Sequence, residues 1–158
     1  MDEPTIFVGV TRTKLLLVGA ALAASALLLA QTDPSSVTYV VHDKVMEALS
    51  KGGTLATGSD FRVAGAQRDK PGLPEAHDKE TEIVLIMDGE ATYVTGGTLS
   101  GSKESQPGER KGNGIEGGQT RHLTKGDVIV LPPGTPHWFK EVPARISYYD
   151  VKVHKQGR

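Results

Sequence analysis

The stretch Gly126–His137, GDVIVLPPGTPH, contains the local signals that decide the fold. Its Gly-Asp pair opens an apolar, β-branched run, and a Pro-Pro-Gly sequence follows that run before His137. Because the run at Val128–Leu131 is short and bounded by turn residues, we expect a strand there. The prolines and glycine predict a tight turn, so His137 should begin the next strand.

A second informative stretch lies earlier, at Glu75–Gly89, EAHDKETEIVLIMDG. Glu75 and His77 are two residues apart, so on a strand their side chains project from the same side. A polar turn over residues 78–81 would let Glu82 begin the next strand, facing His77. The two stretches therefore predict that two imidazoles and one or two carboxylates meet, although they are far apart in sequence.

Such a group is a candidate metal site with mixed nitrogen and oxygen donors. The chain has no cysteine, which excludes disulfides and thiolate ligands. Imidazole and carboxylate donors with open positions suit one divalent transition metal (Mn, Fe, Zn, Ni, Co or Cu) better than Ca or Mg. The candidate ligands are His77, Glu82 and His137, with Glu75 as a fourth.

The two stretches resemble the paired motifs of the cupin superfamily. The first motif has His-x-His, three or four residues, Glu, six residues and Gly; the chain has Glu75-x-His77, four residues, Glu82, six residues and Gly89. The second motif has Gly, five residues, Pro-x-Gly, two residues and His. The chain matches this motif at Gly126, Pro132, Gly134 and His137. The resemblance covers residues 54–153.

This resemblance implies an all-β fold, a double-stranded β-helix or jelly-roll barrel that holds a metal inside. The chain departs from the motifs at Glu75, where the family usually has its first His, and at Glu141, where an Asn often closes the second motif. Three alternatives stay open. Glu75 is a fourth ligand, or it hangs free beside a three-ligand site, or the site holds no metal.

The side chains around the candidate ligands predict the wall of a pocket. Val84 and Ile86 fall on the same side of their strand as Glu82, and Phe139 falls on the same side as His137. Tyr93 and Tyr148 either donate a hydrogen bond to a bound ligand or pack in the core. Three further histidines are expected to be surface or hydrogen-bonded residues: His42, His122 and His154.

The N-terminus carries a targeting signal. Residues 15–30 are uncharged and mostly apolar, and Arg12 and Lys14 stand before them. This pattern is typical of a secretory signal, which we assign to residues 1–31. The apolar run is shorter than the roughly 20 residues that span a bilayer, so we expect a periplasmic or secreted protein with no stable membrane span after processing. The alternatives are an uncleaved membrane anchor and a buried helix.

The remaining chain divides into a linker with a short helix, residues 32–53, and a barrel domain, residues 54–158. The helix is expected at His42–Ser50 because two glycines follow. Beyond it we expect short strands at 61–66, 82–87, 91–94 and 145–153, with a hairpin turn at Asp88-Gly89. Residues 100–118 contain six glycines and no apolar period, which predicts a long mobile loop that covers the barrel mouth or is a plain insertion.

Length and composition exclude some classes of function and leave others open. A length of 158 residues allows one domain, and a net charge of −1 offers no basic surface for nucleic acid. Two predicted strands, 82–87 and 128–131, are apolar on both faces, which favours a homodimer. The sequence leaves three functions open: a small metalloenzyme, a module that binds a small ligand such as a sugar or organic acid, and a structural protein with an empty site.

Overall fold

The computed structural model describes residues 37–154. These residues form one helix and twelve strands, in the order α1 (His42–Lys51), β1 (Gly53–Thr57), β2 (Phe61–Arg68), β3 (Glu75–His77), β4 (Glu80–Thr95), β5 (Thr98–Ser100), β6 (Lys103–Gln106), β7 (Glu109–Lys111), β8 (Gly114–Glu116), β9 (Gln119–Thr124), β10 (Val128–Leu131), β11 (His137–Glu141) and β12 (Ile146–His154). The predicted signal segment, residues 1–31, lies outside the described residues. Within residues 37–154, no helix has the length and apolar character needed to cross a membrane.

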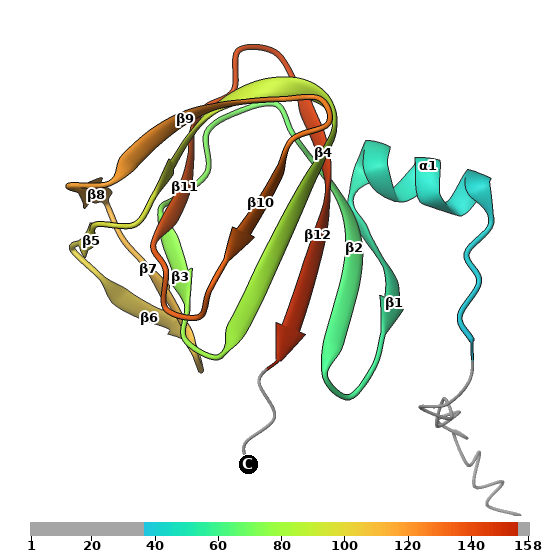
Figure 1. Cartoon of the computed structure of the whole chain (residues 1–158), viewed down its shortest axis with the longest axis horizontal. Helices are drawn as coiled ribbons and strands as arrows, with labels where there is room; N and C mark the ends of the chain where they lie inside the picture. Colours follow the sequence, from blue (N-terminus) through green and yellow to red (C-terminus); the bar gives the residue numbers. More distant parts are fainter. Residues whose placement is uncertain (1–36, 155–158) are drawn as a thin grey trace, which may run out of the picture. The chain divides into compact units, whose positions relative to one another are not determined.

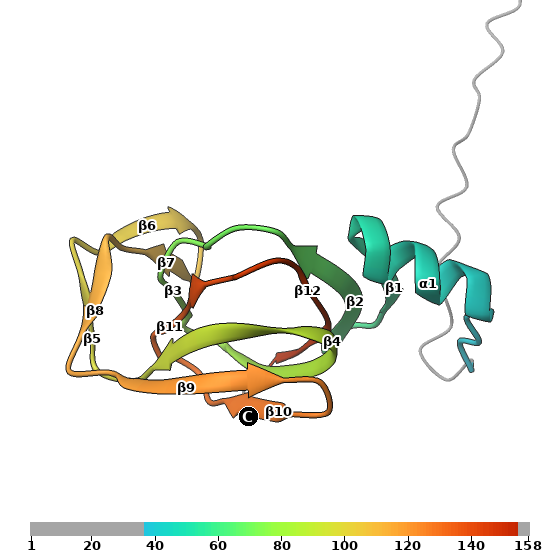
Figure 2. The same cartoon turned by 90° about the horizontal axis from the view of Figure 1, so that it is seen from above.

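The strands curve around one interior, as Figures 1 and 2 show from two directions. Ten strands form one sheet system whose path runs β1-β2-β12-β4-β11-β3-β7-β6, while β9 and β10 each pair with β4. Strands β5 and β8 form a separate antiparallel pair. All pairings are antiparallel. The all-β jelly-roll barrel expected from the sequence is therefore confirmed.

Strand β4 is the central strand of the barrel. Its first half pairs with β10 and β12, and its second half pairs with β9 and β11. The predicted hairpin turn at Asp88-Gly89 is wrong, because one strand continues through both residues. Gly89 has a φ of +83°, and the opposite strand shifts register between Ser147 and Tyr148. The pair thus marks the corner at which β4 passes from one set of partners to the other.

The predicted mobile loop at residues 100–118 is also wrong. This segment forms β6, β7 and β8, and β7 pairs along its whole length with β3. Its strands are three or four residues long, too short to show an apolar period in sequence. Backbone pairing orders the segment instead: β6 pairs with β7, and β8 pairs with β5. It extends the sheet past β3 and directs Glu109 toward the barrel interior.

Helix α1 confirms the predicted helix and packs against the outer face of the barrel. Its buried residues are Ala48 and Leu49, and it ends at Gly52, which has a φ of +80°. Gly65 on β2 makes the close approach possible, because a Cβ at that position would lie 2.7 Å from the backbone of Ala48.

An apolar block fills one part of the barrel interior. Phe139 packs edge-on against Tyr93, with ring centroids 4.6 Å apart, and stacks on Tyr148 at 5.0 Å. Val84 and Ile86 complete this block from β4. Every residue assigned to the pocket wall from sequence thus lies in one buried cluster, beside the polar residues described next.

Candidate metal site

Three of the four candidate ligands meet inside the barrel, each from a different strand. His77 ends β3, Glu82 lies near the start of β4, and His137 begins β11. The Oε2 atom of Glu82 lies 3.2 Å from Nε2 of His77 and 3.3 Å from Nε2 of His137. All three side chains are buried. The polar turn after His77 and the Pro-Gly turn before His137 bring about this convergence.

Glu75 lies at the rim of the same group. Its Oε1 atom is 3.8 Å from Nε2 of His137, and its backbone pairs with that residue in the ladder. Glu75, His77 and His137 each offer one donor atom, and these atoms lie within 4.8 Å of one another. Glu82 approaches both imidazoles more closely than Glu75 does, so we treat the four residues together as the candidate site.

The hydrogen bonding of His137 shows that this donor set fits a cation. Nδ1 of His137 lies 3.0 Å from the carbonyl oxygen of Thr135 and donates to it, which leaves the lone pair of Nε2 facing Glu82 when the ring is neutral. Within the described residues, neither Nε2 of His137 nor Oε2 of Glu82 has a hydrogen-bond partner. Buried polar atoms without partners are costly, and a divalent ion between them would satisfy both.

The ionisation of the group reflects the same proximity. Burial by itself raises the pKa of Glu82, but the neighbouring His137 and His77 outweigh it and hold the pKa well below the ordinary value. Burial lowers the pKa of His137, and the nearby Glu82 carboxylate more than reverses this, so the pKa is raised. Both shifts in pKa have the direction that a nearby opposite charge produces.

Lys152, which was not expected from the sequence, also reaches this site. Its Nζ atom lies 2.9 Å from Nε2 of His77 and 3.2 Å from Oε2 of Glu80. A signal was present in the alternation of the last strand. Tyr148 was assigned to the pocket, and a period of two places Lys152 on the same side.

Glu109 was missed as well, because it lies in the segment predicted to be a loop. Its Oε2 atom is 3.6 Å from Nδ1 of His77. Ser105 and Gln106 donate hydrogen bonds to its carboxylate, and Lys111 lies 3.1 Å from it. A carboxylate held behind a histidine in this way orients the ring and its other nitrogen.

A cavity of about 390 Å³ opens beside His77; we call it the mouth cavity. Its lining mixes basic, acidic and amide side chains, from the ends of β2, β4 and β12 and from the β6–β7 hairpin. The lining residues are Arg62, His77, Lys79, Glu80, Gln106, Pro107, Gly108, Glu109, Lys152 and His154. A small polar molecule could therefore reach the candidate site from this side.

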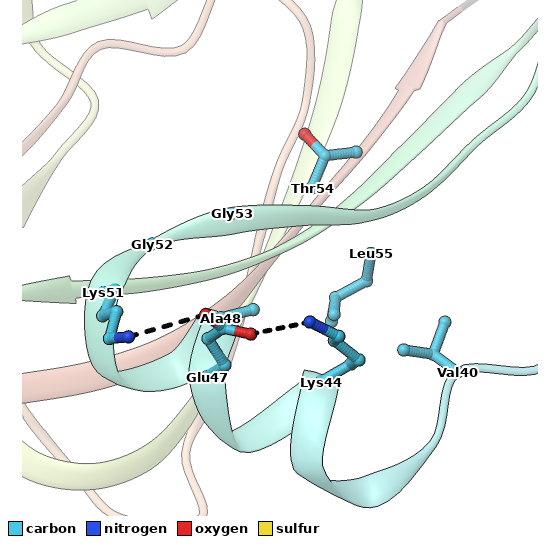
Figure 3. A pocket seen from close by; sticks show the side chains of 9 residues that line it. All are labelled: Val40, Lys44, Glu47, Ala48, Lys51, Gly52, Gly53, Thr54 and Leu55. Carbon is cyan, nitrogen blue, oxygen red and sulfur yellow. Dashed lines mark hydrogen bonds and ion pairs between the residues drawn. The ribbon is translucent and has the colours of Figure 1, made fainter.

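A second cavity, of about 340 Å³, lies between α1 and β1 (Figure 3). Lys44 and Lys51 both extend toward Glu47 there, with nitrogen–oxygen distances of 3.0 and 3.5 Å. Its lining contains no histidine and one carboxylate, already paired with two lysines. This cavity therefore lacks the donors of a metal site.

The remaining polar residues singled out from sequence have other surroundings. The hydroxyl of Tyr93 is buried and, within residues 37–154, has no hydrogen-bond partner. The hydroxyl of Tyr148 accepts a hydrogen bond from Arg68. His122 is exposed and lies 3.2 Å from Glu90, and His154 is exposed and lies 3.3 Å from Glu80. Burial raises the pKa of Tyr93, which keeps its hydroxyl protonated as a donor.

Comparison with known proteins agrees with the fold. A family model described as Cupin matches residues 29–147, which is most of the chain. A search of curated proteins finds no match to the sequence.

Several solved structures share the architecture at low sequence identity. A Bacillus halodurans protein is 15% identical with a TM-score of 0.57, over 80% of this chain and 89% of that one. An uncharacterised conserved protein of Klebsiella pneumoniae with a double-stranded β-helix domain is 16% identical (TM-score 0.51; 77% and 95%). Hydroquinone 1,2-dioxygenase from Sphingomonas sp. TTNP3, with 4-hydroxybenzoate bound, is 15% identical (TM-score 0.51; 71% and 73%). At these identities the similarity shows the fold alone.

Proposed function

The chain belongs to the cupin family, and from this premise we propose that it is an exported metal-binding protein that acts as a small metalloenzyme on a small oxygenated metabolite. One observation carries the proposal. Two buried imidazole nitrogens converge on one carboxylate oxygen at 3.2 and 3.3 Å, and two of these three atoms have no hydrogen-bond partner in the described residues.

The proposed ligands are His77, Glu82 and His137, with Glu75 as the fourth. A first-row transition metal held by them would supply Lewis-acid or redox chemistry to a substrate oxygen. The chain's own residues would exclude water and bind the substrate. The aromatic block around Phe139 excludes water from one side. The hydroxyl of Tyr93, which has no hydrogen-bond partner among residues 37–154, is available to donate a hydrogen bond to a bound substrate.

The experiment that tests this function is metal analysis of protein purified without a histidine tag, followed by turnover assays. We expect about one first-row metal ion per chain, and oxygen consumption or product formation with one member of a panel of small oxygenated metabolites. Protein that contains no metal after purification, and takes up none when Mn, Fe, Co, Ni, Cu or Zn is supplied, would refute the proposal. The fold shared with a dioxygenase motivates the oxygen assay and does not identify the reaction.

The alternative function is a non-catalytic module that binds a sugar or an organic acid. The mouth cavity favours it, because its lining carries both basic and acidic side chains that can hydrogen-bond a polar ligand. A metal-loaded protein that binds such a compound without consuming oxygen or releasing product would support this alternative over the enzyme.

Two substitutions at Glu75 test whether this residue is a metal ligand. If Glu75 is a fourth ligand, Glu75→Gln should weaken metal binding about 10-fold, whereas Glu75→His should retain it because imidazole replaces the lost donor. The measurement is the metal dissociation constant from titration against a competing chelator. Equal metal affinities in the wild type and both variants would show that Glu75 is not a ligand.

We also propose that the chain forms a homodimer through the outer face of β10 and β4. Val128 and Val130 are 56% and 58% exposed, and they pair with Leu85 and Ile83 on the neighbouring strand. This apolar surface is costly to leave in water. Light scattering at micromolar concentration should give the mass of two chains, and Val130→Lys should reduce it to one. A monomeric mass for the wild type would contradict the dimer.

Export remains a proposal from residues 1–31. It predicts that protein recovered from the periplasm or the culture medium begins after the apolar run. Mass spectrometry of the intact secreted chain would show this directly, and an unprocessed N-terminus in the membrane fraction would favour the anchor.

A further inference from the structure

A cation of the chain itself already occupies part of the candidate site. Nζ of Lys152 lies 2.9 Å from Nε2 and 3.3 Å from Nδ1 of His77, so the ammonium lies over the imidazole ring and not along the lone pair of either nitrogen. The same ammonium lies 3.9 Å from Oε2 of Glu82. The side chain of Lys152 is largely buried, at 12% exposure, so this is not a contact made at the surface by a freely moving side chain.

A lysine in this position opposes metal binding in two ways. The ammonium group has three donors and no lone pair, so it cannot act as a ligand while it is protonated. The two positive charges would also repel each other in a site with little water to screen them.

We propose that Lys152 is an internal counter-ion whose charge opposes a metal at Nε2 of His77, and that it shifts further toward Glu80 when the metal enters. The inference rests on the proposed metal site and adds a residue that sets how tightly the site holds its ion. Lys152 is not a ligand in this scheme; it acts on the metal through its charge.

The surroundings of Lys152 give the displaced ammonium a place to go. Oε2 of Glu80 is already 3.2 Å from Nζ, and its side chain is part of the lining of the mouth cavity. His154 contacts the other oxygen of Glu80, at 3.3 Å, which keeps that carboxylate in place. A small rotation away from His77 would therefore keep the charge-assisted pair with Glu80.

The charges of Lys152 and the three neighbouring carboxylates, Glu75, Glu80 and Glu82, sum to zero only when a divalent ion is added. Without a metal, the ammonium of Lys152 lies among Glu80, Glu82 and His77. With a divalent ion, the carboxylates of Glu75 and Glu82 match its charge, while Lys152 is matched by Glu80. Without the ion, the ammonium offsets part of the negative charge, so the metal affinity of the site would be lower than its four donors alone would give.

The test compares metal affinity in Lys152→Met with that in Lys79→Met, using titration of zinc and manganese against a competing chelator. Lys79 lines the same cavity, is exposed, and provides a matched loss of one positive charge away from His77. We expect Lys152→Met to bind both metals at least 10-fold more tightly than the wild type, and Lys79→Met to change affinity by no more than about 2-fold. Thermal unfolding of the metal-free proteins shows whether each variant is folded.

A double-mutant cycle with Glu80→Gln then separates competition from a direct role of Glu80. If Glu80 acts by receiving the ammonium, Glu80→Gln should weaken metal binding in the wild type and have no effect in the Lys152→Met background. Tight binding by the wild type with no gain in Lys152→Met would overturn this inference and leave the metal site standing. Failure of all variants to bind any metal would overturn both. Binding by Lys152→Met alone would support this inference and refute metal binding by the wild-type chain.

Discussion

Replacing His137 with alanine is expected to abolish metal binding, with a loss in affinity of at least about 100-fold. The imidazole is buried, its Nδ1 is fixed by the carbonyl of Thr135, and its Nε2 faces Glu82 at 3.3 Å. Substitutions that only disturb the surroundings of a ligand typically cost 10–100-fold in affinity, and removal of the ligand itself should exceed that range. Metal content after dialysis, with a chelator titration for the residual affinity, measures the effect.

His122→Ala is the matched control, because it removes a histidine from an exposed position beside Glu90, on the outer side of β9. It should leave the metal content unchanged. His77→Ala should behave like His137→Ala, although loss of His77 also releases Lys152 from its partner. Unchanged metal content in both His77→Ala and His137→Ala would remove the basis of the proposed function, whatever the barrel looks like.

Gly89→Ala is expected to destabilise the fold by about 3 kcal/mol or more. The left-handed backbone of this residue costs an alanine about 1–2 kcal/mol. A Cβ there would also lie 1.9 Å from the carbonyl oxygen of Arg145, and overpacking of that kind typically costs a further 1–3 kcal/mol. The atom in the way belongs to the backbone of the chain entering β12, so a side-chain rotation cannot relieve the contact.

Gly96→Ala isolates the first of these two contributions. Gly96 has a φ of +74°, and a Cβ there would meet no atom within 4 Å. Urea unfolding should therefore show a loss of about 1–2 kcal/mol for Gly96→Ala and a clearly larger one for Gly89→Ala. Similar losses in the two variants would mean that the corner of β4 relaxes, and that the contact with Arg145 does not determine its geometry.

The candidate site shows how much of the structure local sequence patterns can predict. Glu75-x-His77, Glu82 and His137 were found from sequence because each stands at a fixed spacing from turn residues, and turns are local structures. Local patterns also predicted the helix at residues 42–50 and the strands β2, β10 and β12 within a few residues of their bounds, whereas the strands expected at 82–87 and 91–94 are parts of one strand, β4. It also placed Val84, Ile86 and Phe139 on the inner face, because a strand alternates its side chains with a period of two.

Two local signals led to wrong expectations for the same reason. Asp88-Gly89 has the composition of a hairpin turn, yet β4 continues through it because β12 and β11 supply partners on both sides of the corner. Residues 100–118 have the composition of a loop, yet β3 provides an edge on which β7 pairs. A composition that permits a turn or a loop does not require one when a long-range partner is present.

The sequence by itself determined that this is an all-β cupin barrel and which histidines and glutamates are the candidates for a metal site, since spacing and alternation are properties of neighbouring residues. Only the tertiary structure decided that Lys152 and Glu109 join them. These two residues lie 75 and 32 positions beyond His77 in the chain, and no local pattern records which strand becomes the neighbour of another. That pairing is set by how the whole chain buries its apolar faces and satisfies its backbone hydrogen bonds, which is a property of the complete fold.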